Sequence, residues 1–313
     1  DGQAHHLLIG GISRSGTTLL CAILDSVPSW SFGAELVPPP ETRNTLNSGE
    51  LTGASMDARS WKLAQRSGLT TEDVQRALQQ VHGSISRRDR DPYMEFNLAL
   101  LTERAQRCRS ELLGFKWNRG GAMRVFKLYP EVLFLTIVRH PSDVLRSQLD
   151  RGFNRTPQEM LDAWTAVYRG YLEMAQLDPT RIHLLRYEDL VRDPKGSLEC
   201  AMSELGLAFH PEMLRHYDSD SAILTQGHVN SRQLNRPISP PAAQSPVSDL
   251  VNFDVHVSRE TKRLMDDFGY EQTRVRGYSP RGVFPAKPPS LATHVIREKR
   301  NQFSGKRKFS KDE

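Results

Sequence analysis

The stretch Gly10-Gly11-Ile12-Ser13-Arg14-Ser15-Gly16-Thr17-Thr18 decides the fold of this 313-residue chain. It lies between a short apolar run, residues 7–10, and residues 17–27, where apolar side chains recur at helical spacing. Glycines let the backbone turn tightly, and the N–H groups of such a loop and of the next helix converge on an oxyanion. The hydroxyls of Ser15, Thr17 and Thr18 add donors. We therefore expect a strand–loop–helix unit that binds a phosphate-like group.

The loop differs from one that binds a nucleoside triphosphate. From Gly11 its spacing almost fits G-x-x-x-x-G-K-[ST], but Thr17 follows Gly16 where the lysine should stand. The loop cation is Arg14 instead. The apolar run at residues 132–138 ends in Arg139, not in an aspartate that would hold Mg²⁺. A P-loop nucleotide kinase stays an alternative, but it lacks its lysine and its metal ligand.

The rest of the chain alternates strand-like and helix-like segments. Further apolar strand candidates are residues 112–116, 132–138 and 182–185. Four helix starts carry capping signals: Thr70 with Asp73, the capping box Thr156-Pro157-Gln158-Glu159, Asp193-Pro194, and Ser258. Such alternation predicts an α/β fold of three layers, with a parallel sheet and helices on both faces.

Composition narrows the function classes. The 42 Lys and Arg against 37 Asp and Glu leave a net charge of +5, which suits an anionic ligand but does not argue for nucleic acid. No run of about 18 apolar residues predicts a membrane span. The three cysteines, Cys21, Cys108 and Cys200, are far apart and form neither a zinc motif nor a disulfide framework. Cys21 falls on an expected buried helix and is interpreted as a core residue.

Taken together, the motifs resemble those of the sulfotransferases that use 3′-phosphoadenosine 5′-phosphosulfate (PAPS). Residues 8–20 are similar to the family's 5′-phosphosulfate loop, which implies that Arg14, Ser15, Gly16, Thr17 and Thr18 bind the donor. The arginine-containing form R-S-G-T-T-L resembles the tyrosylprotein sulfotransferases and related bacterial proteins. The resemblance implies a P-loop-like sulfotransferase fold and transfer of a sulfonate from PAPS, with 3′,5′-ADP as product and no metal.

Two further motifs stand in the family's order. Residues 138–147, Val-Arg-His-Pro-Ser-Asp-Val-Leu-Arg-Ser, resemble its 3′-phosphate site, where Arg139 and Ser147 would bind and Arg151 would help. The segment Arg186-Tyr187-Glu188-Asp189-Leu190 resembles [RK]-Y-E-D-L, whose tyrosine contacts the nucleotide. Arg232 and Arg236 resemble, more weakly, a basic loop that closes over the nucleotide.

The resemblance also implies the catalytic residues. Glu35, in Phe-Gly-Ala-Glu after the first helix, is the candidate base for the acceptor hydroxyl, with Glu41 as the alternative. Lys116 ends a strand where the family places a lysine that steadies the transferring sulfonate. Arg14 would act with it on the leaving-group oxygen. His140 lies beside the 3′-phosphate motif and is interpreted as structural.

We expect one sulfotransferase domain over residues 1–278, with an acceptor-side insertion near 37–111 and a long loop near 218–254. Residues 279–313 are interpreted as a basic, disordered tail. The acceptor is a hydroxyl of a tyrosine peptide, a glycan or a small molecule, and a homodimer remains open. We expect a cytoplasmic protein, or a Golgi-lumen one if an upstream anchor has been removed. A non-catalytic nucleotide-binding protein on the same fold is a further alternative.

Overall fold

The computed structural model describes residues 5–33, 69–82, 91–117, 120–220, 234–238 and 250–270. The expected tail at 279–313, and the candidates Glu35, Glu41 and Arg232, lie outside these residues. The expected insertion at 37–111 is described over 69–82 and from residue 91 onward. There it contains two helices, α4 (Thr71–His82) and α5 (Pro92–Cys108).

Five parallel strands form one sheet in the order β2-β3-β1-β4-β5. The strands are β1 (His5–Gly10), β2 (Trp30–Gly33), β3 (Leu112–Trp117), β4 (Val132–Val138) and β5 (Ile182–Arg186). The predicted α/β class and parallel sheet are confirmed. Gly10 of β1 lies opposite Trp117 on one side and Thr136 on the other. The carboxyl ends of these three central strands therefore meet at one edge, where open α/β sheets bind their ligands.

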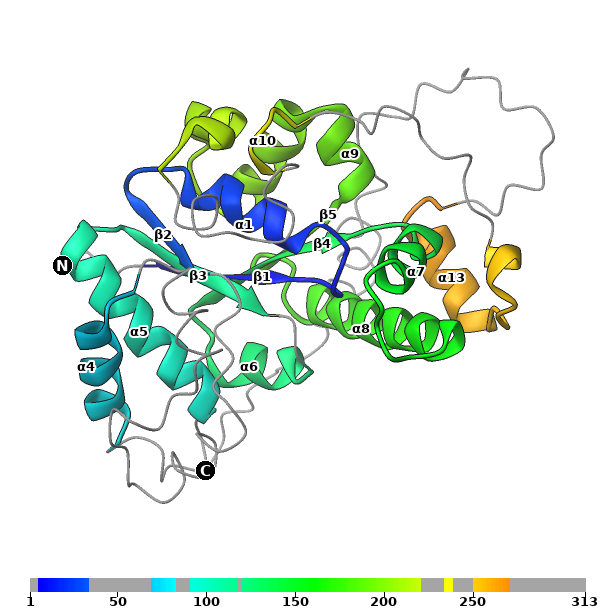
Figure 1. Ribbon diagram of the computed structural model, residues 1–313, viewed down its shortest axis with the longest axis horizontal. Coiled ribbons are helices and arrows are strands. Elements are labelled where there is room, and N and C mark those ends of the chain that lie inside the picture. Colours follow the sequence, from blue (N-terminus) through cyan, green and yellow to red (C-terminus); the bar gives the residue numbers. More distant parts are fainter. Residues whose placement is uncertain are drawn as a thin grey trace, which may run out of the picture.

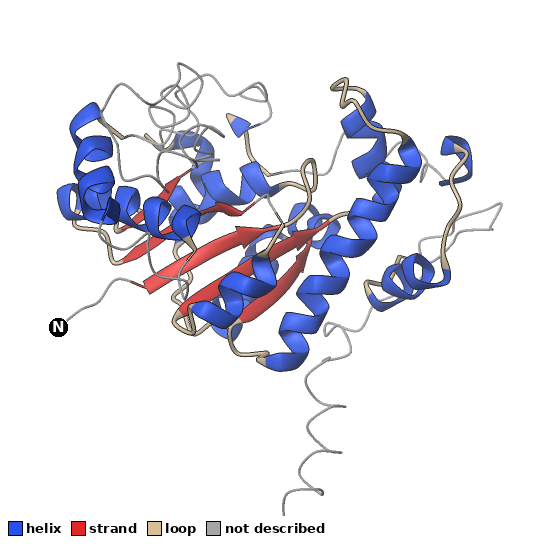
Figure 2. Ribbon diagram, turned by 90° about the horizontal axis from the view of Figure 1, so that it is seen from below, coloured by secondary structure: helices blue, strands red, loops and turns tan. Residues whose placement is uncertain are grey.

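Helices pack on both faces of the sheet (Figures 1 and 2). One face carries α1 (Thr17–Asp25), α9 (Tyr187–Arg192) and α10 (Pro194–Glu204). The other carries α5, α6 (Ala122–Leu128) and α8 (Pro157–Leu177), with α4 packed on α5. The helices α7 (Pro141–Leu149) and α13 (Arg259–Asp267) pack against α8. Two short 3₁₀ helices, η2 (Pro211–Asp218) and η3 (Leu250–Phe253), complete the described elements.

The alternation of side chains along β1 produces two cores. Leu7 and Ile9 belong to the core shared with α1 and α10, whereas Leu8 belongs to the core shared with α5, α6 and α8. All three side chains are fully buried, because β1 is central and both of its faces are covered. Cys21 is buried in the first of these cores, as expected.

Local capping signals predicted the helix starts correctly. Thr156 and Glu159 form the reciprocal capping box of α8. Thr70 and Asp73 exchange backbone-to-side-chain bonds of 2.8 and 3.2 Å before α4. Asp193 caps α10 and Ser258 caps α13. Each cap satisfies N–H groups that the first turn of a helix leaves without a partner.

Three details differ from the expectations. The first helix ends at Asp25 instead of residue 27, and the expected loop at 218–254 contains η3. The strand β2 was not predicted, because its four residues are at the lower limit of length at which an alternating pattern can be recognised.

Candidate active site

Three residues of the loop between β1 and α1 have a backbone conformation with positive φ. Gly11, Arg14 and Gly16 have φ of 139°, 79° and 111°, and an L side chain such as that of Arg14 tolerates this region only at a cost. The backbone N–H and the hydroxyl of Ser15 both donate to the carbonyl of Ile12, at 3.1 and 2.7 Å. The hydroxyl of Ser15, expected to face a ligand, is buried and closes the loop on itself.

Helix α1 starts directly from this loop. Its N-cap is Gly16, which offers no side-chain cap. The first N–H groups of a helix have no acceptor within the helix, and the helix dipole favours negative charge at this end. The loop and the start of α1 therefore present backbone donors that suit an anionic ligand.

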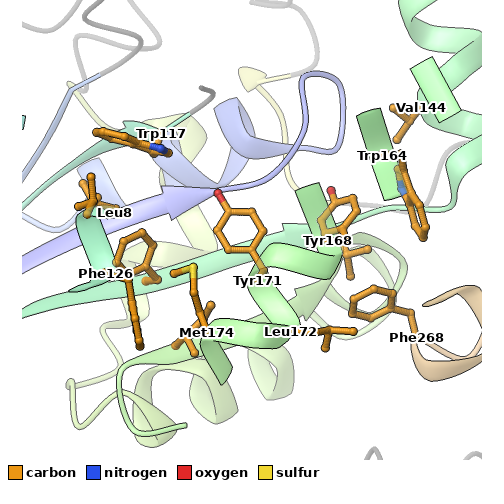
Figure 3. Close-up of a cluster of buried hydrophobic side chains, with 14 of the residues drawn as sticks. Leu8, Trp117, Phe126, Val144, Trp164, Tyr168, Tyr171, Leu172, Met174 and Phe268 are labelled. Atoms are coloured by element: carbon orange, nitrogen blue, oxygen red, sulfur yellow. The ribbon is translucent and has the colours of Figure 1, made fainter. Parts of the chain in front are cut away.

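Two tyrosines of α8 contact the residues at the start of the loop. The hydroxyl of Tyr168 donates to the carbonyl of Ile137 at 2.9 Å and accepts from the N–H of Ile12 at 3.4 Å. Gly10 packs so closely on Tyr171 that a Cβ there would lie 2.7 Å from its ring. Figure 3 shows the Tyr171 hydroxyl at the end of β1. Burial raises the pKa of both tyrosines, so both stay neutral. On sequence alone they belong to an ordinary apolar helix face, and nothing in the pattern marks this role.

Arg14 joins the two phosphate motifs. Its Nε donates to the hydroxyl of Ser147 on α7 at 3.0 Å, across 133 positions of sequence. Burial, and then the charges of Arg151 and Arg139, lower the pKa of Arg14. The charges of Arg151 and Arg139 therefore repel that of Arg14, and an anion with several negative charges would relieve that repulsion.

Arg139 leaves β4 close to the loop. Its guanidinium lies 4.5 Å from the centre of the Tyr187 ring, a cation–π contact. Its Nε is buried without a hydrogen-bond partner, and its contact with Asp143 is long, at 3.4 Å. The Tyr187 ring in turn lies against Gly16. The R-Y-E-D-L segment thus contacts both phosphate motifs.

The amine of Lys116 donates to the hydroxyl of Thr18 at 3.3 Å. Lys116 lies opposite Ile9 in the sheet, one residue before the end of β3. Its charge is thereby placed at the first turn of α1, beside the loop. Thr17, in contrast, is almost fully buried.

Other candidates are less tied to this cluster. Arg151 is exposed after α7 and acts on Arg14 through its charge. Arg236 is exposed, and no hydrogen bond or ion pair joins it to another described site residue. His140 is the N-cap of α7, and its Nδ1 and the Ser142 hydroxyl are 2.6 Å apart.

Among the described residues, no group of three or more His, Cys, Asp or Glu side chains could hold a metal ion. The same residues include no helix long and apolar enough to cross a membrane.

A family model described as "Sulfotransferase family" matches residues 7–211. A putative protein-tyrosine sulfotransferase of Caenorhabditis briggsae is 26% identical over 83% of this chain and 85% of its own length. Protein-tyrosine sulfotransferase 2 of Gallus gallus is 24% identical over 67% of this chain, which spans about half (53%) of that protein.

A solved structure shares the fold. The sulfotransferase domain of the Synechococcus PCC 7002 olefin synthase superposes with a TM-score of 0.61 at 20% identity. The alignment covers 87% of this chain and 96% of that domain.

Proposed function

The chain belongs to the sulfotransferase family, and we propose that it moves the sulfonate of PAPS to the hydroxyl of a tyrosine in a protein or peptide. The observation that carries the proposal is the 3.0 Å hydrogen bond between Arg14 and Ser147. It joins the loop suited to a phosphosulfate to the helix suited to a 3′-phosphate, so one ligand with anionic groups at both ends would bridge them.

The residues present fit such a donor. The loop N–H groups and the start of α1 would hold the 5′-phosphosulfate. Arg139, Ser147 and Arg151 would hold the 3′-phosphate, and Tyr187 would contact the nucleotide. The buried Arg139 Nε without a partner supports this assignment, because a buried donor is normally satisfied.

PAPS supplies an activated sulfonate, and the protein supplies charge and alignment. Lys116, held beside Thr18, is placed to stabilise negative charge on the sulfonyl oxygens. Arg14 is placed to act on the leaving phosphate oxygen. Glu35 would accept the proton of the acceptor hydroxyl as its oxygen bonds to sulfur and the bond from sulfur to the 5′-phosphate breaks. The product is 3′,5′-ADP.

Tyrosine as acceptor is supported by the relative that matches most of its own length, the C. briggsae protein described as a putative protein-tyrosine sulfotransferase. Glycans and small phenols are the competing acceptors. A tyrosine peptide and its phenylalanine counterpart differ only in the hydroxyl, so label on the tyrosine peptide alone would identify the tyrosine oxygen as the acceptor.

The test uses labelled PAPS with matched tyrosine and phenylalanine peptides, a glycan panel and small phenols. We expect label on the tyrosine peptide only, and none with the Arg14→Ala variant. Label on glycans or phenols alone would overturn the acceptor class. Thermal stabilisation by ATP–Mg²⁺ but not by 3′,5′-ADP would overturn the donor, and nucleotide binding with transfer to no acceptor would indicate a non-catalytic protein.

A further inference from the structure

The turn between β4 and α7 contains Arg139, whose charge acts on Arg14, and two side chains hold the backbone of this turn. The carbonyl of Arg139 accepts from the indole Nε1–H of Trp164 on α8, at 3.0 Å. The N–H of His140 donates to Oε1 of Glu188 on α9, at 2.9 Å. This carbonyl and this N–H belong to the same peptide group, so two side chains from different helices hold one peptide plane from both of its edges.

Glu188 is itself held in place. Its second oxygen, Oε2, accepts from the hydroxyl of Tyr270 at 2.8 Å. Tyr270, which follows α13, is almost fully buried between the ring of His140, 5.1 Å away, and the guanidinium of Arg186, 4.7 Å away. Both carboxylate oxygens of Glu188 therefore have a donor, which fixes the side chain in one orientation.

Trp164 has equally little freedom. Its side chain is fully buried, and its ring packs edge-on against Tyr168, at 5.0 Å, and Phe268, at 6.3 Å. Figure 3 shows Trp164 and Phe268 side by side in this core. The Trp164 donor is therefore supplied by a rigid core, and Tyr270 links the segment that follows α13 to the same turn.

We propose that Trp164, Glu188 and Tyr270 are positioning residues that orient Arg139 toward the 3′-phosphate of the donor. This inference rests on the proposed function and deepens it. The direct contacts of the Arg139 side chain are few, a ring face and one long ion pair. The direction in which the side chain leaves the backbone is therefore important, and it is fixed by the anchored peptide group that follows the Arg139 Cα. If either edge of that peptide is released, the guanidinium keeps its charge but loses its alignment with the phosphate.

The experiment compares two ligands that differ only in the 3′-phosphate, 3′,5′-ADP and 5′-AMP, by calorimetry on the full chain. Trp164→Phe keeps an aromatic ring and removes the indole donor, and Tyr270→Phe removes only the hydroxyl. We expect each to weaken 3′,5′-ADP binding about 5–10-fold, the effect of one lost hydrogen bond, and to leave 5′-AMP binding unchanged. Glu188→Ala should have the same selective effect, and Glu188→Gln, which keeps one acceptor oxygen, should recover part of it.

Two controls separate orientation from packing. Trp30→Phe changes a buried tryptophan at the start of β2, the opposite end of the sheet, and should leave both affinities unchanged. In an Arg139→Ala background, Trp164→Phe and Tyr270→Phe should cause no further loss of 3′,5′-ADP affinity, because the residue they orient is gone.

Three results would overturn the inference. Equal losses for both ligands would indicate a general packing role, unchanged 3′,5′-ADP binding in Trp164→Phe, Tyr270→Phe and Glu188→Ala would indicate no role, and undiminished losses without Arg139 would indicate another route. If the wild-type protein bound both ligands equally, the proposed donor itself would be wrong, and that result is visible before any variant is made.

Discussion

The substitution Gly16→Ala tests how tightly the phosphate loop and the R-Y-E-D-L segment are coupled. At Gly16 the backbone has φ 111° and ψ 6°, which an L residue adopts only under strain. A Cβ there would lie 2.7 Å from Cδ2 of Tyr187 and 3.1 Å from Cδ1 of Ile137, whereas ordinary contact begins at 3.4 Å. The loop or the Tyr187 ring must therefore move, and Arg139 packs on the same ring.

The loss of unfolding free energy in Gly16→Ala can be compared with that in a matched control, Gly121→Ala. Gly121 is also the N-cap of a helix, α6, with φ 86°, but a Cβ there would meet nothing within 4 Å. Gly121→Ala should cost only the backbone strain, about 1–2 kcal/mol of unfolding free energy. Gly16→Ala should cost the same strain plus about 1–3 kcal/mol from overpacking.

The assay pairs denaturant unfolding with 3′,5′-ADP calorimetry on both variants. Gly121→Ala should bind 3′,5′-ADP as the wild type does. Gly16→Ala should bind it at least about tenfold more weakly, which corresponds to a loss of about 1.4 kcal/mol of binding free energy from the displaced loop. If Gly16→Ala lost no more stability than Gly121→Ala and kept its affinity, the contact between Gly16 and Tyr187 would carry no coupling, and this reasoning would be refuted.

Three further outcomes are expected. Glu35→Gln should keep 3′,5′-ADP affinity and lower the transfer rate about 10²–10⁴-fold, the usual cost of removing a general base; a near-normal rate would shift the role to Glu41. Arg104→Ala should lower the unfolding free energy by about 1.5–3 kcal/mol, because it removes the 2.9 Å ion pair to the buried carboxylate of Asp25, which keeps the N–H of Phe32 as a donor; Asp25→Asn in the same chain should recover part of the loss in a denaturant titration. Burial lowers the pKa of His216 from 6.5 to about 4, so the neutral ring stabilises the fold fully above pH 6.5 and this stability is lost as the pH falls toward 4; His216→Leu should flatten that part of the pH–stability curve.

Helix starts and buried strands could be predicted from the sequence because their causes are local. A capping residue acts within three positions, and a central parallel strand is apolar throughout, as residues 132–138 are. The strand β2 has no such local cause. The N–H of its residue Phe32 donates to Asp25, and its carbonyl accepts from Arg104, 72 positions away. Helix α5 did carry one readable signal, Pro92 at its first position.

The site divides in the same way. Residues proposed to bind the donor, such as Arg14, Gly16 and Arg139, are charged residues or glycines, which the sequence can reveal. Residues that support them, such as Tyr168 and Trp164, are aromatic positions on an apolar helix face. Their pattern is the same whether the hydroxyl or indole holds a catalytic loop or only fills the core, so only the fold separates the two roles.

The hydroxyl of Ser147 is a neutral partner for Arg14, whose guanidinium is repelled by the charges of Arg151 and Arg139. A serine hydroxyl that accepts from Arg14 fixes that arginine without neutralising it. A carboxylate at the same position would bind Arg14 more strongly, but it would also offset the positive charge that a dianion would meet. Ser147 therefore holds Arg14 in place and leaves its positive charge without a negative counterpart from this partner. Such a cluster gains most from a ligand with two anionic ends, because binding both relieves the repulsion and satisfies donors that the free protein leaves exposed or unpaired.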